Sequence, residues 1–191
     1  AFVRDRLDFA YIDAKEQWLI VNAASAKRAE SLIHALRLAI GSLKCTPFEC
    51  DRSAESLLTE WVRQGYADAP FVLGEECELK APKDGRTIRA KKEDLSSDEI
   101  RAHLAAGLNV QKSSLLWGED LTFVLGADLA INRLKFQDVL RERAGDRKPE
   151  SVAEEFDTTF FIMSETLRRF VKDLAGALGG EVGNLPEGEF I

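Results

Sequence analysis

The sequence predicts an α+β protein in which antiparallel β-hairpins pack with helices. Three observations predict this class. Runs rich in β-formers occur in neighbouring pairs separated by short turns, apolar residues at helical spacing lie between those pairs, and the 45% hydrophobic content of the 191 residues is enough for a core. We expect a central hairpin-and-helix region at 1–66, a tip region with a projecting basic hairpin at 67–107, and a base region with a β-meander and C-terminal helices at 108–191.

The first region is predicted to form a hairpin followed by two helices. Each helix is expected to begin after a serine that caps its amino end and to stop at a glycine. The predicted elements are strands at Leu7–Asp13 and Trp18–Ala23, a helix from the cap Ser25 to Gly41, a short strand at Thr46–Phe48, and a helix from the cap Ser53 to Gly65.

The second region is predicted to be a hairpin and a helix. Two extended runs, "FVLGEECELK" and "TIRAKK", are joined by residues 81–85, whose Pro, Asp and Gly are typical turn residues. Ser96 and Glu99 have capping-box spacing, so we expect a helix to begin there and to end at Gly107.

The third region is predicted to be a three-stranded meander followed by helices. In the longest helix an apolar stripe runs from Phe160 to Leu178, which indicates core packing or a dimer seam. The predicted elements are strands at Val110–Trp117, Leu121–Leu125 and Leu129–Phe136, a helix at Phe136–Arg143, a helix that starts at Pro149, and the longest helix, capped by Asp157 and ended by Gly179 and Gly180.

Composition excludes several classes of protein. A net charge of -7 argues against a chain that coats nucleic acid with its whole surface, but it allows one basic face. No apolar run is long enough to span a bilayer and no secretory leader is recognisable, so we expect a cytoplasmic protein with no membrane partner. The odd cysteine number, three, predicts reduced thiols rather than a disulfide framework or a zinc site, and His34 and His103 fall on predicted helices, away from any nucleophile.

The segment between Lys83 and Lys92 concentrates positive charge, with five basic side chains and one acid. On a strand, Arg89 and Lys91 share a face, whereas Lys92 lies on the other face with Ile88 and Ala90. Such a strand could contact phosphates without reading bases, or it could be an edge strand that its charges protect from aggregation. The residues alone leave both interpretations open.

A competing hypothesis is a Mg²⁺-dependent nuclease. Alternation places Glu76, Glu78 and Lys80 on one side of a strand, as in metal-dependent nucleases that hold Mg²⁺ and orient water. The pattern is common by chance, and a cross-strand salt bridge is the favoured interpretation. We therefore predict no catalytic residues, no metal and no cofactor.

Several longer stretches resemble the bacterial recombination-associated protein RdgC family. The likeness includes "IRAKKEDLSSDEI", "YIDAKEQWLIVNAASAKRAESLIHALRLAIGSL", "LTEWVRQG", "NRLKFQDVLRE", "FDTTFFIMSETL" and "LGGE", in the family's order, and it covers residues 1 to about 181. The resemblance implies a homodimer closed into a ring around double-stranded DNA, binding without sequence preference in the nucleoid and restraining the RecA recombinase. Sequence classifications have also given the family the label "putative exonuclease".

The resemblance also suggests positions. Family members are longer, so we expect this chain to be a fragment matching their C-terminal two thirds or so. Phe2 matches the hydrophobic residue that closes the ring, Ile88–Lys92 matches the basic tip strand, and Glu93 stands where a neutral glutamine is expected. The expected phosphate contacts are Arg86, Arg89, Lys91 and Lys92, with Lys112, Arg133 and Lys135 as weaker candidates. A third hypothesis is a dimerisation module whose DNA binding resides elsewhere.

Overall fold

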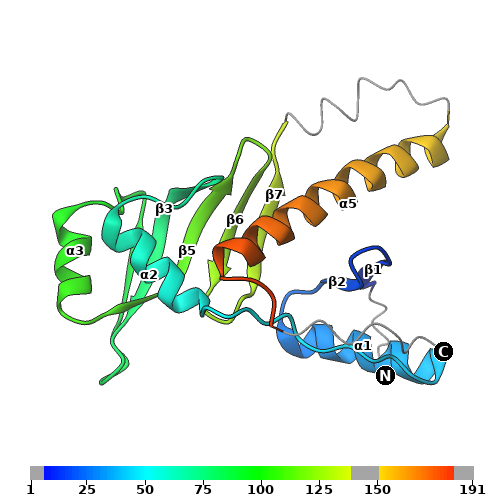
Figure 1. Cartoon of the computed structure of the whole chain (residues 1–191), viewed down its shortest axis with the longest axis horizontal. Helices are drawn as coiled ribbons and strands as arrows, with labels where there is room; N and C mark the ends of the chain where they lie inside the picture. Colours follow the sequence, from blue (N-terminus) through cyan, green and yellow to red (C-terminus); the bar gives the residue numbers. More distant parts are fainter. Residues whose placement is uncertain (1–6, 139–150, 183–191) are drawn as a thin grey trace, which may run out of the picture. The chain divides into compact units, whose positions relative to one another are not determined.

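The computed structural model describes residues 7–138 and 151–182, which fall into two compact units, Ala1–Pro47 and Phe48–Ile191 (Figure 1). Antiparallel sheets combine with helices, so the predicted α+β class is confirmed. Among the described residues no helix is both long and apolar enough to cross a membrane.

The first unit is a hairpin followed by a helix. Strands β1 (Phe9–Asp13) and β2 (Trp18–Asn22) pair in antiparallel fashion. The Asp13 carboxylate closes the turn by accepting the backbone N–H of Lys15 at 3.1 Å and of Glu16 at 3.2 Å. Helix α1 (Ala26–Ile40) follows the predicted cap Ser25, although the Ser25 side chain makes no capping hydrogen bond.

The second unit is built on one five-stranded antiparallel sheet. Its strand order is β4-β3-β5-β6-β7, so the predicted basic hairpin and the predicted meander belong to the same sheet, with β4 at its edge. The strands are β3 (Phe71–Lys80), β4 (Thr87–Lys91), β5 (Asn109–Trp117), β6 (Leu121–Gly126) and β7 (Ile131–Phe136).

The described part of this unit also contains helices α2 (Ala54–Gln64), α3 (Asp98–Ala105) and α5 (Val152–Ala177). In Figure 1, α2 lies over β3 and β5 and the C-terminal half of α5 lies over β6. Phe170 of α5 makes edge-to-face contacts with Trp117 and Phe123, whose ring centroids lie 5.8 and 4.8 Å from its own. Residues from α2, α5 and the covered face of the sheet therefore form one core.

Two polar contacts fix the helices against the sheet. Thr59 of α2 accepts the Val110 backbone N–H at 2.9 Å, where β5 carries an irregular register. The Trp117 indole donates to Asp173 of α5 at 2.8 Å. Buried donors with partners avoid the desolvation cost of unpaired polar groups, so these contacts add orientation to the apolar packing.

Several predicted boundaries are wrong. The short strand at Thr46–Phe48 does not form, and Cys50 instead makes an isolated antiparallel bridge with Glu181. The cap of α3 is Ser97 rather than Ser96, because the Ser97 hydroxyl accepts the Ile100 N–H.

The start of α5 and its neighbours also need correction. The helix is capped by Ser151, which accepts the Glu154 N–H at 3.2 Å, so Asp157 lies inside the helix and does not cap it. Strand β7 begins at Ile131 instead of Leu129. The predicted helix at Phe136–Arg143 lies largely, and the start at Pro149 entirely, outside the described residues.

The apolar stripe of α5 divides into two parts. Leu167, Phe170, Leu174 and Leu178 are buried and Val171 is half-buried, which confirms the core interpretation for the C-terminal half. Closer to the amino end, Phe156 is 66% exposed and stacks on Phe160 with a centroid separation of 6.0 Å.

Candidate nucleic-acid interface

The second unit has one sheet face that α2 and α5 do not cover, which we call the open face. Strand alternation and register define it: Glu76 lies opposite Lys91, and Glu78 lies between Arg89 on β4 and Lys112 on β5. Among the residues that the structure describes, strand alternation and register place on it the cations Lys80, Arg89, Lys91, Lys112, Arg133 and Lys135 and the carboxylates Glu76 and Glu78.

Five of the seven predicted phosphate contacts lie on the open face, and all five are exposed. They come from three strands that the sheet brings together: Arg89 and Lys91 on β4, Lys112 on β5, and Arg133 and Lys135 on β7. The pattern of basic residues along the chain therefore becomes one basic surface only after the strands pair.

The remaining predicted positions lie elsewhere. Arg86 is in the β3–β4 turn, where its guanidinium donates to Asp84 at 2.7 Å. Lys92 follows the end of β4 with a positive φ of 57°, so strand alternation does not apply to it and the prediction that it shares a face with Ile88 and Ala90 does not hold. Phe2 lies outside the described residues.

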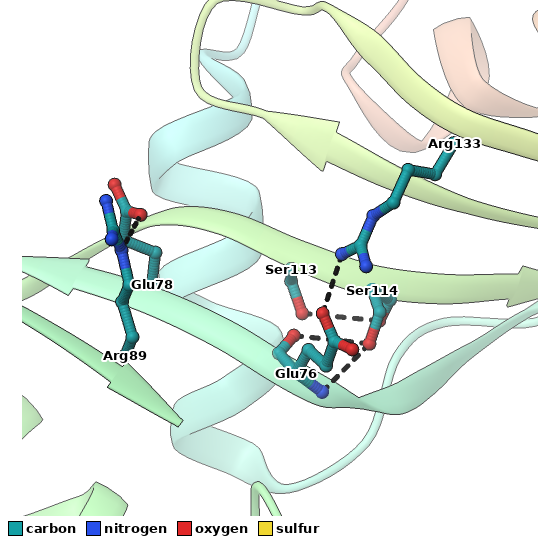
Figure 2. Close-up of polar contacts among 6 residues, drawn as sticks. All are labelled: Glu76, Glu78, Arg89, Ser113, Ser114 and Arg133. Carbon is teal, nitrogen blue, oxygen red and sulfur yellow. Dashed lines mark hydrogen bonds and ion pairs between the residues drawn. The ribbon is translucent and has the colours of Figure 1, made fainter. Parts of the chain in front are cut away.

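Arg133 reaches the open face from a bulge. The register of β6 and β7 shifts between Thr122 and Val124, and Arg133 has a left-handed φ of 51°. Its guanidinium donates to Glu76 on β3 at 2.6 Å, across β6 and β5, as Figure 2 shows. This hydrogen bond lowers the pKa of the Glu76 carboxyl, so Glu76 is charged at neutral pH.

Glu78 also binds an arginine. It accepts from Arg89 on the neighbouring strand at 2.8 Å, with the Arg89 side chain 70% exposed (Figure 2). Glu76, Glu78 and Lys80 share one side of β3 as predicted, and the favoured cross-strand salt bridge is confirmed for Glu78.

Ser114 anchors the centre of this face. Its hydroxyl accepts the Glu76 N–H at 2.9 Å and donates to the Glu76 carbonyl at 3.2 Å, at a place where the β3 and β5 ladder is interrupted. A Cβ atom on Gly74 would lie 2.4 Å from the Ser114 hydroxyl oxygen. The close approach thus needs glycine at 74, and it fixes the backbone from which the Glu76 side chain projects.

Four lysines on the open face have no salt-bridge partner within the described ranges. They are Lys80, Lys91, Lys112 and Lys135, from four different strands. Their ammonium groups can approach an anion without first breaking an ion pair, whereas Arg89 and Arg133 must share their charge with a carboxylate.

The other candidate chemistry is sparse. In the part of the chain that the structure describes, no group of three or more His, Cys, Asp or Glu side chains could hold a metal. All three thiols are free; Cys77 is buried, and burial raises its pKa to about 11, while Cys45 and Cys50 are half-buried. His34 and His103 lie on α1 and α3 as predicted.

Comparison with known proteins identifies the family. A family model described as "Putative exonuclease, RdgC" matches residues 1–181. The chain belongs to the RdgC family. Proteins named recombination-associated protein RdgC from Yersinia enterocolitica, Yersinia pestis and Yersinia pseudotuberculosis are each 44% identical to it over 182 residues. The match covers 95% of this chain and 60% of each of these RdgC proteins.

Two features of the open face were not predicted from the sequence. One is the left-handed bulge that carries Arg133 to Glu76, and the other is the role of Ser114 and Gly74 beneath it. No local signal marks the bulge, since Arg at a positive φ contradicts residue preference. The predicted resemblance to RdgC is confirmed over nearly the whole chain.

Proposed function

We propose that this chain binds double-stranded DNA without sequence preference through the open face. The observation that carries the proposal is the gathering of six cations on the open face of a protein whose net charge is -7, namely Lys80, Arg89, Lys91, Lys112, Arg133 and Lys135. A positive surface on an acidic chain focuses attraction for polyanions on one side of the molecule.

The geometry suits a phosphate backbone. Four strand spacings of roughly 4.8 Å separate β4 from β7, so the basic residues span about 19 Å across the sheet. On one DNA strand, where phosphates follow at about 3.4 Å along the helix axis, this distance corresponds to about five to six base pairs. Lysine and arginine contacts to phosphate fix the position of the duplex but carry no base information. The expected binding is therefore salt-dependent and independent of sequence.

For the complete protein we propose a nucleoid-associated homodimer, closed into a ring around the duplex, that restrains RecA-mediated recombination. The family resemblance and the recombination-associated name of the relatives support this. A ring would let one positive wall hold DNA while the rest of the surface stays acidic, because encirclement raises the effective concentration of each contact. Phe2 is the proposed ring-closure contact, and this chain spans about 60% of the relatives' length.

The test compares two double variants in duplex titrations at several salt concentrations. Lys91→Ala with Lys112→Ala removes two cations from the open face, and Arg63→Ala with Lys172→Ala removes two exposed cations from α2 and α5. The first variant should weaken binding equally for unrelated duplex sequences and flatten the salt slope by about two units. The second should keep the slope of the unsubstituted chain.

Two results would contradict the proposal. Equal slopes for both variants would place binding on another surface. If the unsubstituted chain does not bind at low salt, it acts as a dimerisation module, and a sizing measurement beside the titration would detect the dimer.

A nuclease is the second candidate, because the family model carries the exonuclease description. Its candidate residues remain Glu76, Glu78 and Lys80. End-labelled duplex incubated with the protein and Mg²⁺ distinguishes the two functions: our proposal predicts intact DNA. Degradation that Glu78→Ala abolishes would assign a catalytic role to β3.

A further inference from the structure

The two carboxylates on the open face each lie between cations. One row across the sheet contains Lys91, Glu76, Ser114 and, from the far strand, Arg133; the next contains Arg89, Glu78 and Lys112. Each glutamate accepts a hydrogen bond from its arginine, Glu76 from Arg133 and Glu78 from Arg89. The acidic groups thus occupy the middle of the basic surface.

From this arrangement we propose that Glu76 and Glu78 are positioning residues that hold Arg133 and Arg89 against the sheet and limit the affinity of the open face for a polyanion. The inference rests on the proposed DNA-binding function and deepens it. A phosphate that approaches Arg89 or Arg133 must compete with a carboxylate already bound there, and it also meets that carboxylate's negative charge.

The backbone supports such a role for Glu76 in particular. Its N–H and carbonyl are both bound by the Ser114 hydroxyl, and Gly74 permits the close approach, so the side chain starts from a fixed point. Arg133 occupies a left-handed conformation that disfavours non-glycine residues, and the pair joins β3 to β7 across two intervening strands. The backbone at both residues therefore directs the Arg133 guanidinium toward the Glu76 carboxylate.

Because the Glu76–Arg133 and Glu78–Arg89 ion pairs are exposed, each carboxylate binds its arginine weakly. The arginine side chains are 58% and 70% exposed, and exposed ion pairs are screened by water and salt. The carboxylates can consequently be removed with little loss of folding stability, which separates an effect on DNA binding from an effect on folding.

The test is the double variant Glu76→Gln with Glu78→Gln, with each single variant measured beside it. The matched control is Glu60→Gln on α2 with Glu165→Gln on α5, the helices that cover the opposite face. It removes the same charge from two other ion pairs, those with Arg52 and Arg168. The readouts are duplex affinity at several salt concentrations and the midpoint of thermal unfolding.

We expect the open-face double variant to bind duplex DNA about three- to tenfold more tightly than the unsubstituted chain. The reason is that each exposed glutamate–arginine pair, by competing with phosphate, lowers the affinity for DNA by at most about fivefold. Its salt slope should become steeper by up to about two units, because phosphates would take the place of carboxylates at two arginines. The control variant should change the affinity by less than about twofold and leave the slope unchanged.

Failure of the inference differs from failure of the proposed function. If Lys91→Ala with Lys112→Ala weakens binding while the glutamine variant matches its control or binds more weakly, the glutamates do not limit affinity and the inference is wrong. If neither the unsubstituted chain nor any variant binds duplex, both the proposed function and the inference fail.

Discussion

Arg133 combines an unfavourable backbone conformation with a side chain that crosses the sheet. Its φ of 51° is costly for a residue with a Cβ atom, by about 1–2 kcal/mol. Residues kept in such conformations often serve a binding role, and Lys92, another basic candidate, also has a positive φ. At Arg133, backbone strain therefore occurs at a residue whose guanidinium belongs to the candidate interface.

Replacement of Arg133 separates backbone strain from charge. Both Arg133→Gly and Arg133→Ala lose the ion pair to Glu76, but only glycine adopts the left-handed conformation without penalty. We expect the glycine variant to be more stable than the alanine variant by about 1 kcal/mol in urea unfolding, and both to bind duplex equally weakly. If the alanine variant is as stable as the glycine variant, the conformation carries no strain. If both variants bind duplex as tightly as the unsubstituted chain, Arg133 is not part of the interface.

The Cys77 thiol offers a second test of local environment. Burial raises its pKa from 9.0 to about 11, so at pH 8 the folded protein holds Cys77 as a protonated, unreactive thiol. Iodoacetamide at pH 8 should modify half-buried Cys45 and Cys50 well before Cys77. Mass spectrometry of the peptides measures the order, and rapid labelling of Cys77 in folded protein would contradict the buried position on β3.

Among the elements, the β3–β5 ladder carries the largest irregularity of the sheet. Its register shifts between Leu73 and Cys77, where Ser114 binds the backbone of Glu76 and Gly74 provides the space. Because bulges redirect side chains, this irregularity helps to fix the position of the Glu76 side chain on the open face. The geometry of the proposed interface therefore depends on the packing of Gly74 against Ser114 on the neighbouring strand.

Gly74→Ala tests that dependence. The added methyl would collide with the Ser114 hydroxyl and carbonyl, so we expect a loss of about 1–3 kcal/mol in the free energy of unfolding. Gly176→Ala in α5 is the matched control: it meets nothing within 4 Å, and alanine favours a helix by roughly 0.5–1 kcal/mol. Denaturant unfolding should thus move in opposite directions for the two variants, and equal behaviour would contradict the close approach at Gly74.

For the whole molecule, the central property is the separation of charge. The chain carries 33 Asp or Glu and 26 Lys or Arg side chains. Strand pairing gathers six of the basic side chains on one sheet face, together with Glu76 and Glu78. Sequence-independent DNA binding requires just such a face, while the remaining acidic surface discourages coating of nucleic acid by the rest of the protein.

Hydrophobic patterning and turn residues were sufficient to predict most of the fold. Ser53 and Gly65 delimit α2 as expected, because local capping chemistry decides those ends. At α5 the predicted start was wrong. Ser151 and Asp157 are both residue types that cap helices, and the apolar stripe, which begins at Phe160, does not show how far the helix extends before it. The predicted strand at Thr46–Phe48 failed because a strand requires a partner, and residue preference cannot supply one.

The candidate interface was predicted only in part. Alternation placed Arg89 and Lys91 together, as the register confirms, but it could not show that Lys112 lies beside Glu78 or that Arg133 reaches Glu76. Those relations depend on strand order and on a bulge, which are properties of the assembled sheet. The sequence also suggested Glu76 and Glu78 as metal ligands, whereas in the sheet each binds an arginine.

Lysine footprinting tests the proposed open-face interface most directly. The folded chain is acetylated briefly with and without excess duplex DNA at low salt, and mass spectrometry measures the modification of each lysine. We predict that duplex protects Lys80, Lys91, Lys112 and Lys135 severalfold, while Lys172 on α5 reacts equally in both samples. Bound DNA that leaves the four open-face lysines unprotected, or that protects Lys172 instead, would contradict the account.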